Sequence, residues 1–414
     1  MYKKRSFIMA TALLATLACN HPRQGTESNT GESFPEGTFG YDVTFLQQHD
    51  SVIVLKDGSG MAGVIVSPKY QAKVFTSTAE GPGGRSFGWV NYKAFTGPKD
   101  AHMNAYGGEN RLWLGPEGGK YSLFFKPGAK MVYDNWVTPA AVDTDPWEVS
   151  EKSGQSVSMK KDMQLQNYAG ATLNLSVNRK ITLLDRPSAE SQLSIQLGDS
   201  VKAVGYQTDN TITNTGNKAW TAETGMPCIW ILDMFRPAPR TVIAVPYRHP
   251  EDHKTPVATA DYFGQIPPDR LKYDNGVLFL KADGKSRGKL GVPPGRAKTV
   301  AGSYDPESNV LTIIHFDMDS TGKYLNQEWN TDKPVFSGDA VNAYNDGPLE
   351  DGSQMGPFYE MESVSPAAAL DAGASLSHRH SVFHFTGDKA ALNRIAEQVL
   401  GASLQRIENT FGDQ

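Results

Sequence analysis

The chain has 414 residues, of which 39% are hydrophobic and 21% are charged, and its formal net charge is −5. This length is enough for one large body or two closely fused ones. The negative charge and the lack of lysine or arginine runs after the first residues argue against a nucleic-acid partner, because such a surface repels a polyanion.

The first residues have the pattern of a bacterial lipoprotein signal peptide. Lys3, Lys4 and Arg5 precede a short apolar stretch and then Cys19. We expect removal of residues 1–18, which takes the net charge from −5 to −8, and acylation of the new N-terminus at Cys19. A secretory signal with an incidental cysteine is the alternative. The lack of an acidic run after Cys19 favours the periplasmic face of the cell envelope, with the lipid as the membrane anchor.

Residues 19–38 are polar, rich in Gly, Ser and Thr, and without periodicity, so they predict a flexible tether. From there on, short apolar runs alternate with Gly, Pro, Asn and Asp, and the whole chain holds 40 Gly and 25 Pro. This texture predicts an all-β domain over residues 39–386. No internal repeat or linker divides it, which favours one oversized sandwich or two fused ones.

Individual elements follow from the spacing of apolar residues. Two apolar runs, 52–55 and 62–66, flank a turn and predict a hairpin. Alternation over residues 172–183 predicts a half-buried strand. We expect further strands at 193–197, 277–280 and 310–316.

A C-terminal helical segment is predicted over residues 387–414. Apolar residues recur there at helical spacing after an N-cap at Asp388, and Gly401 is a possible break.

Residues 102–119 are denser in glycine, aromatic and ionisable residues than packing requires. Arg111, Trp113 and Glu117 fall on one face of a predicted strand, because they alternate with leucines. An aromatic plate beside charged hydrogen-bonding groups is what a sugar needs. The alternative is a glycine-rich turn with a structural Arg–Glu pair. Arg85 and His102 are further candidate ligand-binding residues.

Residues 356–366 and 375–385 read as two strands that we expect to pair antiparallel. Glu360 and Glu362 then share one face, and the histidines of the second strand share one face. If those faces coincide, a carboxylate base meets an imidazole acid, which suits proton transfer near neutral pH.

The catalytic candidates in these strands are Glu362, His378 and His380. The same three residues also satisfy the ligand count of a metal site, and spacing does not decide between the two roles. A solvated face of an edge hairpin is the third possibility. We otherwise expect no cofactor.

Three stretches resemble the galactose-mutarotase-like superfamily, which includes the aldose 1-epimerases, and more closely a family of uncharacterised lipoproteins of the Bacteroides type. They are Gly107 to Glu117, Thr211 to Trp220, and Glu360-Met361-Glu362. The resemblance implies a large antiparallel supersandwich. It also implies that Glu362 takes a proton from an anomeric hydroxyl while a histidine protonates the ring oxygen.

The chain departs from the epimerase pattern at two histidine positions. Tyr106 stands where those enzymes have a histidine before the Gly-Gly pair, and the region of Trp230 and Asp233 lacks the other. We therefore expect a lipid-anchored carbohydrate-binding protein that acts on a sugar's anomeric centre if His102, His378 or His380 replaces the missing acid. The alternative is a non-catalytic glycan-binding or scaffolding lipoprotein of a polysaccharide-utilisation system.

Overall fold

A computed structural model describes residues 33–249 and 256–412. The predicted signal peptide (1–18), Cys19 and most of the predicted tether lie outside the described residues. Within the described ranges, no helix is both long and apolar enough to cross a membrane.

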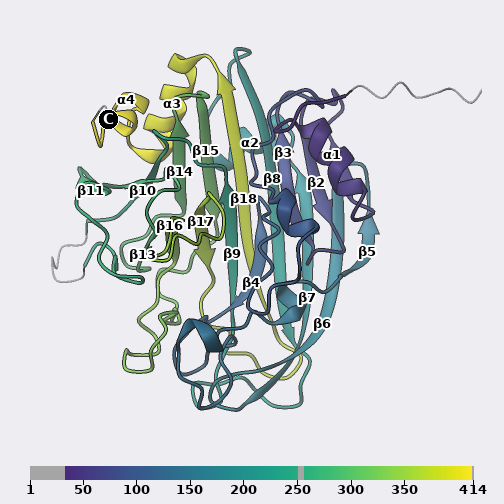
Figure 1. Cartoon of the computed structure of the whole chain (residues 1–414), viewed down its shortest axis with the longest axis vertical. Helices are drawn as coiled ribbons and strands as arrows, with labels where there is room; N and C mark the ends of the chain where they lie inside the picture. Colours follow the sequence, from purple (N-terminus) through teal and green to yellow (C-terminus); the bar gives the residue numbers. More distant parts are fainter. Residues whose placement is uncertain (1–32, 250–255, 413–414) are drawn as a thin grey trace, which may run out of the picture. The chain divides into compact units, whose positions relative to one another are not determined.

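The described residues form three antiparallel sheets, most of whose strands are labelled in Figure 1. The largest sheet has ten strands, in the order β11 (Leu271–Asp274), β12 (Val277–Lys281), β10 (Val242–Pro246), β14 (Val300–Asp305), β15 (Val310–Phe316), β18 (Ser375–Gly387), β8 (Val201–Asn214), β7 (Thr172–Leu183), β6 (Ser156–Gln166), β5 (Glu148–Lys152). The second sheet has five strands, in the order β13 (Gly288–Val292), β16 (Val341–Asn345), β17 (Tyr359–Val364), β9 (Cys228–Phe235), β4 (Arg111–Gly115). A third sheet has the order β1 (Ile53–Lys56), β2 (Gly63–Ser67), β3 (Lys73–Thr78).

The five-stranded sheet packs one face against the ten-stranded sheet. Side chains alternate across each strand, so Met361 of β17 joins the main hydrophobic core, as Val382 of β18 does from the other sheet. The other face of the five-stranded sheet points away from the ten-stranded sheet.

Short helices cover the outer face of the ten-stranded sheet. α3 (Lys389–Leu400) and α4 (Leu404–Glu408) share a second apolar cluster with β10, β14 and β15, beside which they lie in Figure 1. The other helices are α1 (Phe39–Gln47), α2 (Arg186–Leu193), η1 (Tyr92–Phe95), η2 (Tyr133–Asn135), η3 (Ala140–Val142). The predicted class, a large antiparallel all-β sandwich with a short C-terminal helical segment, is confirmed.

Several predicted elements are confirmed at close to their predicted bounds. The hairpin is β1 and β2, which pair from Ile53 with Val66 to Lys56 with Gly63. The predicted strand at 172–183 is β7. Asp388 caps α3, since its carboxylate accepts a hydrogen bond of 2.8 Å from the amide of Ala391.

The strand predicted at 193–197 is wrong, because α2 occupies the preceding residues and ends at Leu193. Asp185 caps this helix by accepting from the amide of Ser188, and Pro187 lies in its first turn. An Asp before a first-turn proline is a helix-start signal that the apolar alternation obscured.

The predicted pairing of 356–366 with 375–385 is also wrong. β17 pairs with β16 and β9, whereas β18 pairs with β15 and β8 in the other sheet. The ten residues between them cross from one layer of the sandwich to the other instead of closing a hairpin.

The α3 cap provides a test of the C-terminal segment. Asp388→Ala removes the acceptor for the Ala391 amide, so the free energy of unfolding should fall by about 1 kcal/mol in urea denaturation. Asp371→Ala, an exposed loop change, is the control and should stay within about 0.5 kcal/mol. An equal loss for both would contradict a capping role.

Candidate functional site

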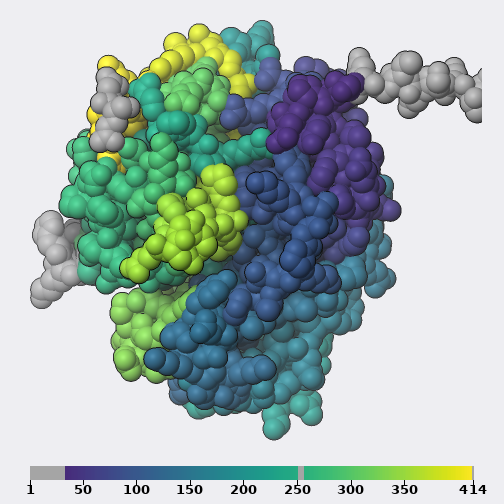
Figure 2. All heavy atoms as spheres, in the orientation of Figure 1, coloured from purple at the N-terminus to yellow at the C-terminus, as the bar shows by residue number. Residues whose placement is uncertain are grey.

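A cleft lies over the outer face of the five-stranded sheet; we call it the sheet cleft. Its outer region has a volume of about 580 Å³, and a narrow inner region of about 80 Å³ reaches the strands. The two regions share lining residues, including Trp136, Phe263 and Arg287. In Figure 2 the segments that border the outer region, around residues 95–135 (blue) and 347–355 (yellow-green), appear on the same face of the molecule.

The lining of the inner region comes from alternate residues of neighbouring strands. Cross-strand register puts Met234, Glu360, Tyr344 and Lys289 in one row, and Arg111, Leu232 and Glu362 in the next. Because side chains alternate, every residue in these rows points away from the ten-stranded sheet. Residues from β4, β9, β13, β16 and β17 therefore meet on one surface.

Two ion pairs hold the charges of this surface. Arg111 donates from Nη2 to Glu360 Oε1 at 2.5 Å. Lys289 Nζ donates to Glu362 Oε2 at 3.0 Å, and Trp230 Nε1 donates to the same oxygen at 2.8 Å. All four charged side chains are buried. A buried ion is costly unless it is paired, so these contacts allow the carboxylates to lie here.

Not every polar atom of this surface has a partner. Among the described residues, Glu362 Oε1 and Arg111 Nε are buried without a hydrogen-bond partner. Such groups are costly in a dry interior, and they are common where a ligand or water completes the network.

Burial changes the proton affinity of the carboxyl groups. It raises the pKa of Glu360, although Arg111 beside it acts to lower it. Burial also raises the pKa of Glu117, against the opposing effect of Lys289. For Lys289, the lowering effect of burial is outweighed by Glu362 and the other carboxylates, so its pKa is raised. The lysine therefore stays charged while Glu117 and Glu360 hold protons more readily than usual.

Aromatic rings form the walls. Trp113 and Trp230 meet edge to face with ring centroids 5.5 Å apart, and Trp136 stacks on Trp329 at 5.8 Å. The Arg111 guanidinium lies 5.0 Å from the centroid of Trp113. Flat apolar surfaces thus stand directly beside charged groups.

The structure brings together five of the predicted site residues. Arg111, Trp113, Glu117 and Glu360 line the inner region, and Glu362 lies beneath it against Trp230. The sequence prediction that the late glutamate strand and the glycine-tryptophan strand share one concavity agrees with this arrangement.

Two predicted ligand-binding residues lie elsewhere. Arg85 is 3.7 Å from Asp305 and hydrogen bonds to Ser308, away from the residues that line the sheet cleft. His102 lies behind the rim, where its Nδ1 is 2.6 Å from the carbonyl oxygen of Trp136. His102 lines neither region of the cleft, but it contacts Trp136, which lines both.

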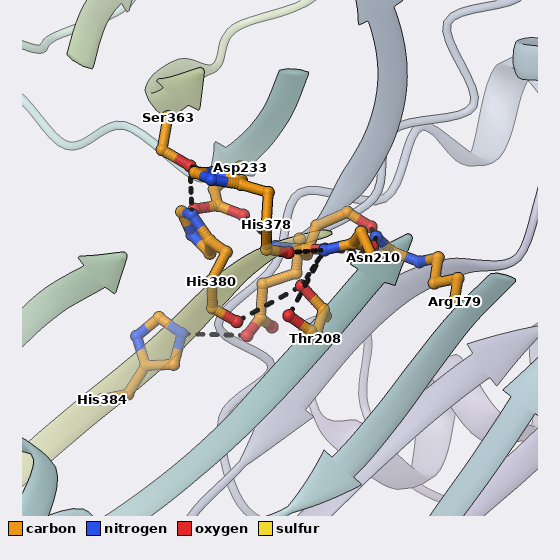
Figure 3. A network of polar contacts seen from close by, with 10 residues as sticks. Arg179, Thr208, Asn210, Asp233, Ser363, His378, His380 and His384 are labelled. Atoms are coloured by element: carbon orange, nitrogen blue, oxygen red, sulfur yellow. Dashed lines mark hydrogen bonds and ion pairs between the residues drawn. The ribbon is translucent and has the colours of Figure 1, made fainter. Parts of the chain in front are cut away.

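The predicted meeting of His378 and His380 with Glu362 does not occur. Both histidines hydrogen bond at 2.8 Å to the hydroxyl of Ser363 (Figure 3). Ser363 lies on the core face of β17, whereas the adjacent Glu362 points the other way. His380 Nε2 also lies 2.6 Å from Asp233. The physical reason is the alternation of β17: adjacent residues 362 and 363 face opposite sides of the sheet.

The histidines belong to a polar network between the two sheets (Figure 3). Asn110 donates to Asp233 at 2.6 Å, and Arg179 donates to Asn210 at 2.7 Å and to Asn110. These side chains are buried. In the part of the chain that the structure describes, no group of three or more His, Cys, Asp or Glu is arranged to hold a metal ion.

A family model matches residues 37–411. The chain belongs to the DUF6786 family. That family is described as one of unknown function. No curated protein matches this DUF6786 member.

Among solved structures, the DUF6786 chain is similar to two sugar-epimerase-like proteins. One, from Escherichia coli, is described provisionally as an aldose 1-epimerase; the identity is 12%, the TM-score 0.48, and the match covers 81% of this chain and 98% of that one. The other is a galactose mutarotase-like protein from Lactobacillus casei, with 14% identity, a TM-score of 0.46, and coverage of 81% and 100%.

Sequence reasoning missed Lys289, Arg287 and three of the cleft tryptophans. Trp230 stands in the run Cys228 to Leu232, whose hydrophobicity indicates a buried strand without telling the two faces apart. Lys289 is a single lysine in a short strand beside glycine. Only the register of five strands brings these residues to Glu362, and no local pattern encodes that register.

The Lys289–Glu362 pair provides a stability test. Lys289→Met leaves a buried carboxylate without its cation, so the free energy of unfolding should fall by about 3–5 kcal/mol. Lys389→Met is the matched control, because Lys389 pairs with Glu408 at the surface and its loss should cost about 1 kcal/mol or less. Urea denaturation at neutral pH measures both; similar losses would argue against a buried pair.

The interior network should make stability depend on pH. Burial lowers the pKa of His378 to about 3, so the unfolded chain binds a proton between about pH 6.5 and 3 that the folded chain does not. The contribution of the neutral His378 to the free energy of unfolding is therefore complete above pH 6.5 and is lost as the pH falls toward 3. The unfolding free energy of the wild type should decline relative to that of His378→Gln by up to about 1.4 kcal/mol per pH unit. A pH-independent difference would show that His378 has the same pKa in the folded and unfolded chain, which contradicts the lowered pKa.

Proposed function

We propose that the chain is a lipid-anchored carbohydrate-binding protein of the cell envelope and that the sheet cleft is its sugar site. The observation that carries this proposal is the adjacency of tryptophan walls and buried, oriented charges in one concavity. A pyranose has apolar C–H faces that pack on an aromatic plate and hydroxyls that bind best to charged donors and acceptors.

The dimensions support a sugar ring in the outer region. Its volume of about 580 Å³ lies within the usual range for small-molecule sites, whereas the inner region of about 80 Å³ is too small for a ring. A bound pyranose would lie against Trp136 and Trp329 and direct one substituent toward Arg111 and Glu360.

The anchoring part of the proposal rests on the signal-peptide pattern and Cys19. Lipidation there would hold the sheet cleft close to the periplasmic face of a membrane through a tether. Mass spectrometry of the mature N-terminus tests this directly, and release of Cys19→Ser into the soluble fraction is the expected result.

Binding without conversion is the form of this function that the geometry favours. Glu362 is fully buried under Trp230, and the two nearest predicted acids, His378 and His380, lie on the other side of the strand. Neither pair, Glu362 with His378 or Glu362 with His380, places a base and an acid on opposite sides of a bound anomeric centre.

One observation supports a catalytic alternative with a different acid. Glu117 lines the cleft with a raised pKa, and Glu362 is held by Lys289 with its Oε1 unpartnered. In this scheme Glu362 takes the anomeric hydroxyl proton while Glu117 protonates the ring oxygen, so that the C1–O5 bond breaks as the C1 carbonyl forms. The ring closes again when O5 attacks the opposite face of the C1 carbonyl. Glu362 then returns its proton to the C1 oxygen and Glu117 takes back the proton of O5, which completes the inversion at C1.

Glycan-array screening followed by isothermal titration calorimetry tests the proposal. We expect saturable binding of a sugar and a loss of roughly 10-fold or more in affinity for Trp136→Ala, which removes a wall of the outer region. Val149→Ala, an exposed change on β5, is the control. The absence of any sugar ligand would reject the proposed function.

Polarimetry on the bound sugar separates binding from catalysis. We expect no acceleration of mutarotation by the wild type. If acceleration is observed, Glu362→Gln and Glu117→Gln should each abolish it and Glu307→Gln, a surface change, should not. Acceleration with this pattern would overturn the non-catalytic form in favour of the carboxylate mechanism.

A further inference from the structure

We propose that the sugar bound in the sheet cleft carries an anionic substituent, and that Arg287 binds it at the entrance to the inner region. This inference rests on the proposed function and names the substrate class of the same site. Nothing in the sequence pattern singled out Arg287, which lies one residue before β13.

Arg287 differs from the other cations of the cleft because it has no acidic partner. Arg111 is paired with Glu360 and Lys289 with Glu362, whereas the Arg287 guanidinium makes no hydrogen bond or ion pair with the residues that the structure describes. Its contact is with Phe263, whose ring centroid is 3.8 Å from the guanidinium carbon. Stacking on the ring leaves the planar N–H donors directed outward along the guanidinium edge.

Arg287 lies where a substituent of the sugar, and not the sugar ring, would contact it. It lines both the outer region and the inner one, and Lys289, two residues further along the chain, also lines the inner region. A sugar ring in the outer region can therefore place a carboxylate, sulfate or phosphate group into the 80 Å³ inner region.

The acidic side chains nearby hydrogen bond to groups other than Arg287. Asp346 shares the outer region with Arg287, but its oxygens accept from the hydroxyl of Tyr344 at 2.9 Å and the amide of Gly356 at 3.1 Å. Asp100 accepts from the amide of His102 at 2.7 Å. Burial raises the pKa of Glu117. Among the described residues, no carboxylate is within ion-pairing distance of the Arg287 guanidinium, so its N–H donors are left for an anionic ligand group.

Titration calorimetry with matched sugars tests the inference on the purified full chain. The probes are glucuronate and galacturonate, their neutral counterparts glucose and galactose, and glucose 6-phosphate and glucose 6-sulfate, together with oligosaccharides of the same residues. We expect an acidic member to bind roughly 10- to 100-fold tighter than its neutral counterpart, because a charged hydrogen-bonded contact has that effect on affinity.

Arg287→Gln should remove most of this preference while leaving affinity for the neutral counterpart within about 3-fold. Arg379→Gln is the matched control, because Arg379 is exposed on β18 and pairs with Asp209 far from the cleft residues. Circular dichroism confirms that both variants fold.

The outcomes separate the inference from the proposed function. Preference for a uronate assigns a carboxylate substituent, and preference for the phosphate or sulfate assigns an ester; both support the Arg287 site. Equal binding of acidic and neutral sugars, or an acidic preference that survives in Arg287→Gln, overturns the inference while carbohydrate binding stands. Failure of every sugar to bind rejects both.

Discussion

The pairing of each buried glutamate with a cation is the constraint on which the sheet cleft depends. Glu360 and Glu362 lie two residues apart on one face of β17, and each would be costly to bury alone. Arg111 reaches one of them from β4, and Lys289 reaches the other from β13. Strands at both edges of the five-stranded sheet thus supply the charges that its central strands require, which ties the chemistry of the cleft to the order of that sheet.

A second polar layer supports the same strands from behind. Ser363 and Asp233 project from β17 and β9 toward the ten-stranded sheet, where His378 and His380 complete their hydrogen bonds. Asn110, directly before β4, also donates to Asp233. A hydrogen-bonded network inside a sandwich fixes the register of the two layers more strictly than apolar packing does. The lining of the cleft therefore rests on strands that are held from both sides.

Local patterns in the sequence were sufficient for several of the elements and for one face of the site. Period-two alternation identified the hairpin at β1 and β2, the strand β7, and the shared face of Arg111 and Trp113. It also correctly put Glu360 and Glu362 on a common face. These are properties of one strand at a time, and a single sequence records them directly.

The same reasoning could not predict which residues meet across neighbouring strands. The pattern of β18 correctly aligned His378 with His380, but it carried no information about which sheet the strand joins, so the expected contact with Glu362 was wrong. Lys289 and Arg287 gave no local signal, because their role depends on non-local pairing of β13 with β16. The fold class was therefore predictable, and the chemical partners within the site were only partly so.

The division of β17 between two environments has a consequence for how this family can diversify. Residues 360 and 362 face the cleft, while 361 and 363 face the interior. Adjacent residues of this strand are therefore constrained by different contacts. A replacement at 360 or 362 would leave Arg111 or Lys289 without its carboxylate, so it needs a matching change on an edge strand of the sheet. A new ligand preference at this strand therefore requires paired replacements on two strands.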